Sequence, residues 1–394
     1  MIKSELIVQK YGGATLADPD KIKQVALRIF KLHQAGAKVV VIVSAMGETT
    51  NQLIALAHRV SSRPTLRELD MLLTTGERIS MALLSMALND LGCPAISFTG
   101  SQAGIITDDS HVNANIVDVK AFRVEDALKD NKVVILAGFQ GVSQNSKEIT
   151  TLGRGGSDIT AVAMAGYLNA DRCEILKDVD SVYTADPKLI SNVRPLAQLN
   201  YQHLLEMTSW GAKVLHYRSV KMAAEKNVQL YIGAAAGDKT SGTLVSNTFS
   251  LSSQNILAIN SYSQVFQIGF QKTVNEKANF KFSGFLQKNQ IGEIQLLHSD
   301  GNSYYYTGPS ETLAALSAFS PNQDFFRIEN SKLASVSTTF AISLGESEAA
   351  SVTELLQQNN IVIYQKFQSK KSLHFFIEAK QKNEAIRILH DSIE

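Results

Sequence analysis

Residues 6–15 read LIVQKYGGAT. The apolar run Leu6-Ile7-Val8 predicts a buried strand, Gly12 and Gly13 predict a turn after it, and a helical pattern follows over about Asp18 to Gln34. Two glycines let backbone N–H groups approach a phosphate, and Lys10 could supply charge to terminal phosphoryl oxygens. Taken alone, the glycine pair is equally consistent with a tight turn, and the sequence contains no Walker A string.

The same alternation continues through the first half of the chain. An apolar, β-branched run over Lys38 to Val43 ends at Ser44-Ala45-Met46-Gly47. Later strand-like runs are Ala95 to Phe98, Val133 to Ala137, Cys173 to Leu176 and Val228 to Ile232. Short continuous apolar strands separated by helices are typical of a mainly parallel sheet sandwiched by helices, an α/β fold whose ligands bind at the carboxyl ends of the strands.

A second glycine-rich cluster is Thr151-Leu152-Gly153-Arg154-Gly155-Gly156-Ser157-Asp158, followed by an apolar helix. A helix cap in a flexible loop would explain Ser157 and Asp158. It would not explain an arginine between glycines, which can present its planar fork to a carboxylate or phosphate.

Three further polar clusters have competing interpretations. Residues 177–188, KDVDSVYTADPK, suit either a nucleotide pocket or a solvated acidic loop. In GAKVLH, residues 211–216, Lys213 could reach a phosphate or extend to solvent. In DMLLTTGER, residues 70–78, Glu77 begins an apolar helix, where a carboxylate often only complements the helix dipole.

The second half of the chain differs in composition and pattern. Only Phe30, Phe98, Phe122 and Phe139 of the 17 Phe precede residue 248. Residues 335–393 predict a strand–helix–strand–strand–helix order of the ferredoxin-like kind, and residues 255–330 repeat it loosely, with a first strand over Ala258 to Phe270 and helices near 275–288 and 311–319. We therefore expect a catalytic domain over 1–248, a linker within Gly237 to Ser253, and two modules over 249–330 and 331–394.

Bulk properties exclude several classes of protein. The net charge of +1 gives no field suited to nucleic acid or an anionic membrane, and no stretch has the length of a membrane span or the pattern of a signal peptide. Cys93 and Cys173 have no metal-ligand spacing, and reduced thiols are favoured over a disulfide. We expect a cytoplasmic protein that binds neither nucleic acid nor membrane.

The order of these segments resembles the amino-acid kinase superfamily, and specifically the aspartate kinases. The family's strings KFGGTS, SAMGxTT, STGE, GFQG, TLGRGGSD, TDVDGVYTxDP and GAKVLHPRS have counterparts here in the same order between about residues 6 and 245. The C-terminal pair of modules resembles tandem ACT domains, each a ferredoxin-like βαββαβ unit. This chain departs from the family strings at Lys177, usually threonine, and at Ser181, usually glycine.

The resemblance implies an enzyme that transfers the ATP γ-phosphoryl group to the β-carboxylate of L-aspartate, the first step towards lysine, threonine and methionine. It implies catalytic roles for Lys10 and Asp158. Aspartate would be bound by Thr50, Glu77, Arg154 and Ser157. ATP would be bound by Gly12, Gly13, Asp178, Tyr183, Lys188, Lys213 and Val214.

The resemblance also implies Mg²⁺ held mainly by phosphate oxygens and water, with no protein ligand named. It implies a homodimer formed through the ACT region, and lysine or threonine as a possible regulatory ligand. Two alternatives remain open at this point. One is a sister enzyme of the same fold that phosphorylates another carboxylate, a carbamate or uridine monophosphate, and the other is a catalytically weak amino-acid-sensing protein.

Overall fold

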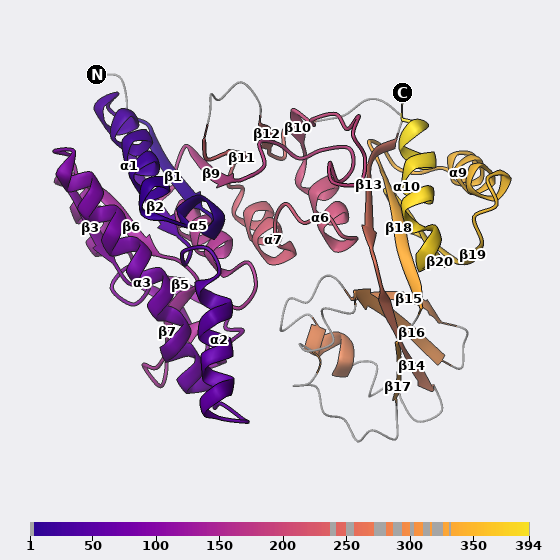
Figure 1. Ribbon diagram of the computed structural model, residues 1–394, viewed down its shortest axis with the longest axis horizontal. Helices are drawn as coiled ribbons and strands as arrows, with labels where there is room; N and C mark the ends of the chain where they lie inside the picture. Colours follow the sequence, from indigo (N-terminus) through magenta and orange to yellow (C-terminus); the bar gives the residue numbers. More distant parts are fainter. Residues whose placement is uncertain are drawn as a thin grey trace. The chain divides into compact units, whose positions relative to one another are not determined.

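The computed structural model describes residues 4–236, 242–249, 256–271, 281–286, 294–299, 303–309, 316, 326–330 and 332–393. The chain divides into two compact units (Figure 1). The first consists of Met1–Val182 and Ser219–Asn247, and the second of Tyr183–Arg218 and Thr248–Glu394. The domain limits expected at residues 248 and 330 stay predictions. Among the described residues, no helix combines the length and the apolar character needed to cross a membrane.

A mainly parallel sheet forms the centre of the first unit, as the apolar runs predicted. Its strands lie in the order β12-β11-β9-β1-β2-β6-β3. They are β1 (Leu6–Tyr11), β2 (Lys38–Val43), β3 (Ala95–Phe98), β6 (Val133–Ala137), β9 (Arg172–Lys177), β11 (Leu230–Ala234) and β12 (Thr243–Val245). All neighbouring pairs in this series are parallel except β11 and β12.

The register of the central strands brings their carboxyl ends to one edge. Tyr11 lies opposite both Val43 of β2 and Leu176 of β9, and Val43 lies opposite Ala137 of β6. The residues that follow these strands, including Gly12 and Gly13, are therefore neighbours in space. This edge is where ligands bind in open parallel sheets.

Helices cover both faces of this sheet (Figure 1). Val39, Val41 and Val43 share a core with α1 (Pro19–Gln34) and α3 (Leu66–Asp90). Successive strand residues point to opposite faces, so Val40 and Ile42 lie on the face that contacts α5 (Gly156–Leu168). The α5 helix is apolar and buried on nearly all sides.

Smaller elements complete the first unit. A short sheet lies in the order β5-β4-β7-β8. These elements are β4 (Ile105–Thr107), β5 (Ile116–Val119), β7 (Gln140–Ser143), β8 (Ile149–Thr151), η1 (Gly13–Leu16), α2 (Thr49–Val60) and α4 (Phe122–Lys129). The helix α7 (Tyr217–Lys226) leads into β11.

The second unit contains two four-stranded antiparallel sheets, in the orders β13-β18-β20-β19 and β15-β16-β14-β17. Their strands are β13 (Ile256–Tyr262), β14 (Val265–Gln271), β15 (Gln295–Ser299), β16 (Ser303–Pro309), β17 (Phe326–Asn330), β18 (Leu333–Phe340), β19 (Ile363–Gln368) and β20 (Ser372–Glu378). The unit also includes β10 (Gln198–Leu199), α6 (Tyr201–Ser209), α9 (Glu346–Gln358), η4 (Ala379–Gln381) and α10 (Lys382–Asp391). One apolar core joins α9 and α10 to the sheet of β13, β18, β20 and β19.

The first of these strands differs from the expectation. The single strand predicted over Ala258 to Phe270 is two strands, because the chain turns at the exposed residues Ser263 and Gln264. The strand β14 pairs with β16 and β17, whereas β13 pairs with β18. The two sheets therefore do not follow one another as separate stretches of sequence.

Several expectations fall partly outside the described residues. Residues 281–286 are helical, within the helix expected near 275–288, and the remainder of that segment lies outside. The helix expected at 311–319, apart from residue 316, also lies outside. The linker expected within Gly237 to Ser253 is wrong in its middle part, because residues 243–245 form the buried strand β12 of the main sheet.

Candidate active site

A buried ion pair lies at the carboxyl edge of the parallel sheet. Nζ of Lys10, near the end of β1, is 2.7 Å from Oδ1 of Asp158, which belongs to the first turn of α5. The two residues are 7% and 4% exposed. A charge pair with so little contact with water is costly to assemble for stability alone. Its place at a ligand-binding edge therefore suggests a chemical role.

A second lysine faces the same carboxylate. Nζ of Lys177, the last residue of β9, lies 3.6 Å from Oδ2 of Asp158. Burial lowers the pKa of Lys177, the negative charge of Asp158 opposes this, and the positive charge of Lys10 adds to the lowering. The two ammonium groups share one carboxylate, and the amino end of α5 adds a further partial positive charge. This edge of the sheet is therefore suited to an anionic ligand.

The loop after β1 is built on close backbone contacts. A Cβ atom at Gly13 would lie 2.7 Å from the carbonyl oxygen of Ala45, so no larger residue fits there without movement. The Gly12 N–H donates to the carbonyl oxygen of Leu176 at 3.3 Å. A Cβ atom at Gly12 would meet only Nζ of Lys10, at 3.8 Å. Glycine at this position thus leaves the approach to the Lys10 ammonium open.

The long helix α3 brings a carboxylate to the loop after β2. Oε1 of Glu77 accepts a hydrogen bond from the Ala45 N–H at 3.1 Å, and Glu77 is 3% exposed. Within the described part of the chain Oε2 has no hydrogen-bond partner. Burial raises the pKa of Glu77 to about 7, against the opposing effect of the Ala45 N–H. Such a carboxylate can receive a cationic group. Thr50, the second residue of α2, is half-buried after the same loop.

The turn into α5 depends on its glycines. Gly153 and Gly155 have φ angles of +73° and +70°, in the left-handed region that favours glycine. Arg154, between them, is exposed, whereas Ser157 is 8% exposed. A Cβ atom at Gly138, after β6, would lie 2.9 Å from Oγ of Ser157. The strand end and the helix start are therefore in direct contact, with the guanidinium free to face solvent or a ligand.

The predicted nucleotide residues divide between the two units. Asp178 is exposed beside Lys177 and borders a pocket of about 700 Å³, which is also lined by Ala14, Thr15 and Arg28. Arg28 donates to the carbonyl oxygens of Ala234 and Ala235 at 2.8 and 2.7 Å.

The other four predicted nucleotide residues, Tyr183, Lys188, Lys213 and Val214, belong to the second unit. Lys188 and Lys213 are exposed there, and Tyr183 forms an isolated bridge with Pro195.

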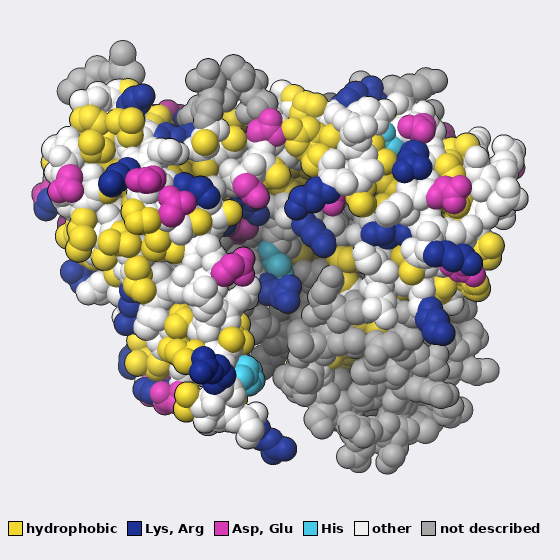
Figure 2. Space-filling model, in the orientation of Figure 1, with side chains coloured by type: hydrophobic (Ala, Val, Ile, Leu, Met, Phe, Trp, Pro, Cys, Tyr) yellow, Lys and Arg dark blue, Asp and Glu magenta, His cyan; other side chains and the backbone are white. Residues whose placement is uncertain are grey.

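The first unit thus assembles most of the predicted site residues, and it adds two that the sequence did not single out. Lys177 appeared only as a departure from the family string. Asp70 was one letter of the segment that contains Glu77, and its helical spacing gave no separate signal, because the polar residues Thr74 and Glu77 lie on the same face. On the face of the molecule in Figure 2, acidic and basic side chains alternate, in keeping with the net charge of +1.

The chain is similar to known proteins along its whole length. The profile of the Amino acid kinase family matches residues 5–234. An aspartokinase of Mycolicibacterium smegmatis is 54% identical over 240 residues, which cover 61% of this chain and 57% of that relative, less than two thirds of its length. Aspartokinase 2 of Bacillus subtilis is 38% identical over an alignment of 409 residues, which covers 99% of this chain and 98% of that relative.

Solved structures show the same fold. Escherichia coli aspartokinase III in complex with aspartate and ADP, in its R state, superposes with a TM-score of 0.81 at 22% identity, over 98% of this chain and 99% of that one. The same enzyme with lysine and aspartate, in its T state, gives 0.71 at 23% identity, over 99% and 100%. The kinase-type sheet and the C-terminal antiparallel sheets are thus both features of a known architecture.

Proposed function

Since the chain belongs to the amino acid kinase family and, within it, to the aspartokinases, we propose that it transfers the γ-phosphoryl group of ATP to the β-carboxylate of L-aspartate. The products are 4-phospho-L-aspartate and ADP. The observation that carries this proposal is the buried Lys10–Asp158 pair, with Lys177 beside it, at the carboxyl edge of the sheet. The E. coli relative, whose structure contains aspartate and ADP, supports the same substrates.

The reaction needs charge neutralisation more than proton transfer. A β-carboxylate oxygen attacks the γ-phosphorus, the bond from that phosphorus to the bridging oxygen breaks, and ADP leaves with the electron pair. The attacking carboxylate is already ionised at neutral pH, so no general base is required. Lys10 neutralises charge that develops on the phosphoryl oxygens, and Asp158 holds the Lys10 ammonium in place.

Aspartate is held by groups around the loop after β2 and the start of α5. The exposed Arg154 guanidinium binds the substrate α-carboxylate through two parallel hydrogen bonds. The buried Glu77 carboxylate, with one oxygen unbonded within the described residues, accepts the substrate ammonium. Thr50 and Ser157 supply further hydrogen bonds. These roles rest on burial and position in the first unit.

ATP phosphates approach the open side of Gly12 and Gly13. Asp178 in the first unit, and Tyr183, Lys188, Lys213 and Val214 in the second, are predicted to contact the nucleotide, and this assignment rests on the resemblance of their strings to the family. Mg²⁺ accompanies the phosphates and reduces their charge. Both oxygens of Asp158 face ammonium groups, so Asp158 does not suit a cation and the metal is held mainly by phosphate and water.

The C-terminal sheets support a homodimer. The strand β19 lies at the edge of its sheet. Tyr364 on this strand is 54% exposed, and Val362, just before the strand, is 51% exposed. Exposed apolar side chains on an edge strand are suited to pairing with a second copy. A sedimentation measurement that finds only monomer at micromolar concentration would contradict this assignment.

A regulatory amino acid, lysine or threonine, is the remaining element of the proposal. The E. coli relative has a T-state complex with lysine. Next to the sheet of β13, β18, β20 and β19, Gly345 precedes α9, and Glu346 and Glu348 lie in the first turn of this helix, where they also complement the helix dipole. The segment that follows β14, residues 272–275, falls outside the described residues. Each amino acid should be titrated against activity at sub-saturating aspartate, and no response up to millimolar concentration would reject regulation.

The proposal is tested by measuring ADP release with a panel of amino acids, together with hydroxamate trapping of the acyl phosphate. Aspartate should be the preferred substrate and should give a trapped hydroxamate. Preference for another acceptor would favour a sister enzyme of the same fold. Aspartate binding without ADP release would favour the catalytically weak sensor.

A further inference from the structure

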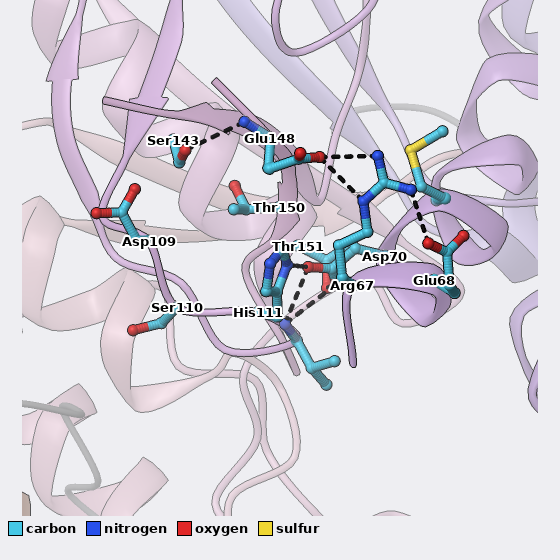
Figure 3. A network of polar contacts seen from close by, with 12 residues as sticks. Arg67, Glu68, Asp70, Asp109, Ser110, His111, Ser143, Glu148, Thr150 and Thr151 are labelled. Carbon is cyan, nitrogen blue, oxygen red and sulfur yellow. Dashed lines mark hydrogen bonds and ion pairs between the residues drawn. The ribbon is translucent and has the colours of Figure 1, made fainter. Parts of the chain in front are cut away.

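Outside the groups assigned above, Asp70, in the first turns of α3, is a buried side chain with several hydrogen bonds (Figure 3). It is 0% exposed. Its oxygens accept from Oγ1 of Thr151 at 2.6 Å and from the Val112 N–H at 3.1 and 3.2 Å, and Nδ1 of His111 lies 2.6 Å away. Burial raises the pKa of Asp70, and these hydrogen bonds oppose that effect. These donors satisfy the hydrogen-bonding requirement of the buried carboxylate.

The bonds join three segments that are distant in sequence. Asp70 belongs to α3, Thr151 is the last residue of β8, and His111 and Val112 lie in the loop between β4 and β5. Val112 has a φ angle of +66°, which is unfavourable for a β-branched residue. The hydrogen bond from its N–H to Asp70 helps to hold this conformation. The loop therefore depends on Asp70 for its shape.

That loop packs directly against the turn that carries Arg154. The Ala114 N–H donates to the carbonyl oxygen of Thr151 at 2.9 Å. A Cβ atom at Gly153 would lie 2.7 Å from Oδ1 of Asn113 and 3.0 Å from the carbonyl oxygen of Val112. Gly153 immediately precedes Arg154. The position of the Arg154 backbone is thus set on one side by Thr151 and on the other by the loop, and both are bonded to Asp70.

Asp70 also shares its helix with Glu77, two turns further along α3. The α3 helix therefore carries Glu77, the proposed acceptor of the substrate ammonium. It also carries Asp70, which anchors the segment that presents Arg154. The distance between Glu77 and Arg154 decides how well the backbone of an α-amino acid fits between them, because its ammonium and α-carboxylate must be bound together. A displacement of this turn would weaken binding without removing any contacting group.

We propose that Asp70 is a positioning residue, which fixes the turn of Arg154 relative to α3 and thereby sets the affinity for the amino-acid substrate. This inference rests on the proposed function for its kinetic consequence. Its structural content, the tethering of residues 151–154 and 111–114 through Asp70, can be tested independently of catalysis.

The kinetic test compares Asp70→Asn and Thr151→Val with Thr151→Ser. Asp70→Asn replaces one acceptor oxygen with an amide N–H₂ group, which then faces other hydrogen-bond donors. Thr151→Val removes one of those donors at nearly constant side-chain volume. Both should raise KM for aspartate about tenfold or more, the loss expected for hydrogen bonds to a charged group, with KM for ATP changed less than twofold. Thr151→Ser keeps the hydroxyl and should preserve KM. In the double variant Asp70→Asn/Thr151→Val, KM for aspartate should be no higher than in the poorer single variant, because both changes disrupt the same set of contacts.

Arg67 provides a matched control. It lies on α3 one turn before Asp70 and reaches Glu148, just before β8, at 2.9 Å (Figure 3). The side chains are 43% and 39% exposed, so this pair joins nearly the same two elements at the surface. Arg67→Gln should leave KM for aspartate unchanged. An unchanged KM in Asp70→Asn, or an equal rise in Arg67→Gln, would overturn the proposal.

Amide hydrogen exchange without substrates separates this inference from the proposed function. Exchange within residues 152–156 and 111–114 should be faster in Asp70→Asn and Thr151→Val than in the wild type, and unchanged in Arg67→Gln. If the wild type does not phosphorylate aspartate, the exchange rates still test whether Asp70 tethers these two segments. Unaltered exchange in folded Thr151→Val would refute the tether.

Discussion

Lys177 and Asp158 are partners across the ends of β9 and α5, with Nζ of Lys177 3.6 Å from Oδ2, while Oδ1 of the same carboxylate is 2.7 Å from Lys10. One negative charge thus stands between two positive charges at the amino end of a helix. A ligand that brings several negative charges balances this excess, whereas a neutral ligand does not. The arrangement favours phosphoryl transfer over chemistry on uncharged substrates.

Lys10→Ala should reduce kcat by about 10²-fold or more, because a charge that faces the transferring phosphoryl group acts mainly in the transition state. Steady-state kinetics with saturating ATP and aspartate would measure the effect. Lys23→Ala, on the exposed surface of α1, is the control and should retain wild-type kcat. A Lys10→Ala enzyme with near-normal kcat would remove Lys10 from the reaction centre.

Lys177→Met should lower kcat/KM for ATP about tenfold, less than the loss of a directly bonded donor, because Lys177 lies farther from Asp158 than Lys10 does. Lys177→Arg keeps the charge and should restore most of the activity. Equal activity of the Met and Arg variants would show that the second cation has no part in binding or transfer.

Arg154→Lys should weaken aspartate binding, because an ammonium group cannot reproduce a two-pronged contact. The expected loss is ~1.5–3 kcal/mol, the range for hydrogen bonds to charged groups, seen as a rise in KM for aspartate. Arg67→Lys, at an exposed ion pair, is the comparison. A rise in KM for ATP alone would reassign Arg154 to the nucleotide.

Glu77 should make stability depend on pH. Its pKa is raised to about 7 in the folded protein from the ordinary value of 4.5 for a glutamate side chain, so between these values the folded state binds more protons than the unfolded state. The free energy of unfolding therefore falls as pH rises from about 4.5 to about 7. Glu77→Gln should remove this decrease in the free energy of unfolding, which amounts to about 3 kcal/mol above pH 7. Urea unfolding at pH 5 and pH 8 would measure it.

The matched control for this pH dependence is Glu68→Gln, on the same helix but with a 65% exposed side chain. It should change the free energy of unfolding equally at both pH values. Glu68→Gln should therefore keep the pH dependence of the wild type. Loss of that dependence in Glu68→Gln, or its absence in the wild type, would contradict the assignment to Glu77.

The aspartate KM offers a second readout of the same group. If the substrate ammonium binds ionised Glu77, KM for aspartate should rise as pH falls below about 7. In Glu77→Gln this slope should disappear. A wild-type KM that is flat between pH 6 and pH 8 would argue against Glu77 as the ammonium acceptor.

Local patterns in the sequence were sufficient for the parallel sheet and for much of its polar edge. Continuous apolar runs such as Val133–Ala137 are typical of strands buried on both faces of a parallel sheet, and glycine-rich strings such as GRGGSD indicate backbone turns. The shared position of Lys10 and Lys177 beside Asp158 could not be read in the same way, because it depends on the pairing of β1 with β9, whose sequences are far apart. Asp70 was equally hidden, since its partners come from β8 and from the loop between β4 and β5, both distant in sequence.

The C-terminal half shows where local patterns mislead. Residues 256–271 have one continuous strand-like composition, yet the chain divides them between two sheets. The division depends on which partner strands are available, β18 for the first part and β16 and β17 for the second. Hydrophobic periodicity carries no information about such partners.

The pairing of β13 with β18 has a consequence for how such a protein can evolve. The sheet of β13, β18, β20 and β19 takes its outer strand from residues 256–262 and the other three from residues 333–378. The residues of this sheet, which we call a module, are therefore not encoded by one contiguous segment of the gene. A single recombination point near residue 331 would deliver three strands without the fourth and expose a buried sheet edge. Exchange of an intact module between relatives requires either crossovers on both sides of residues 256–262 and another before residue 333, or transfer of the whole region from β13 onward.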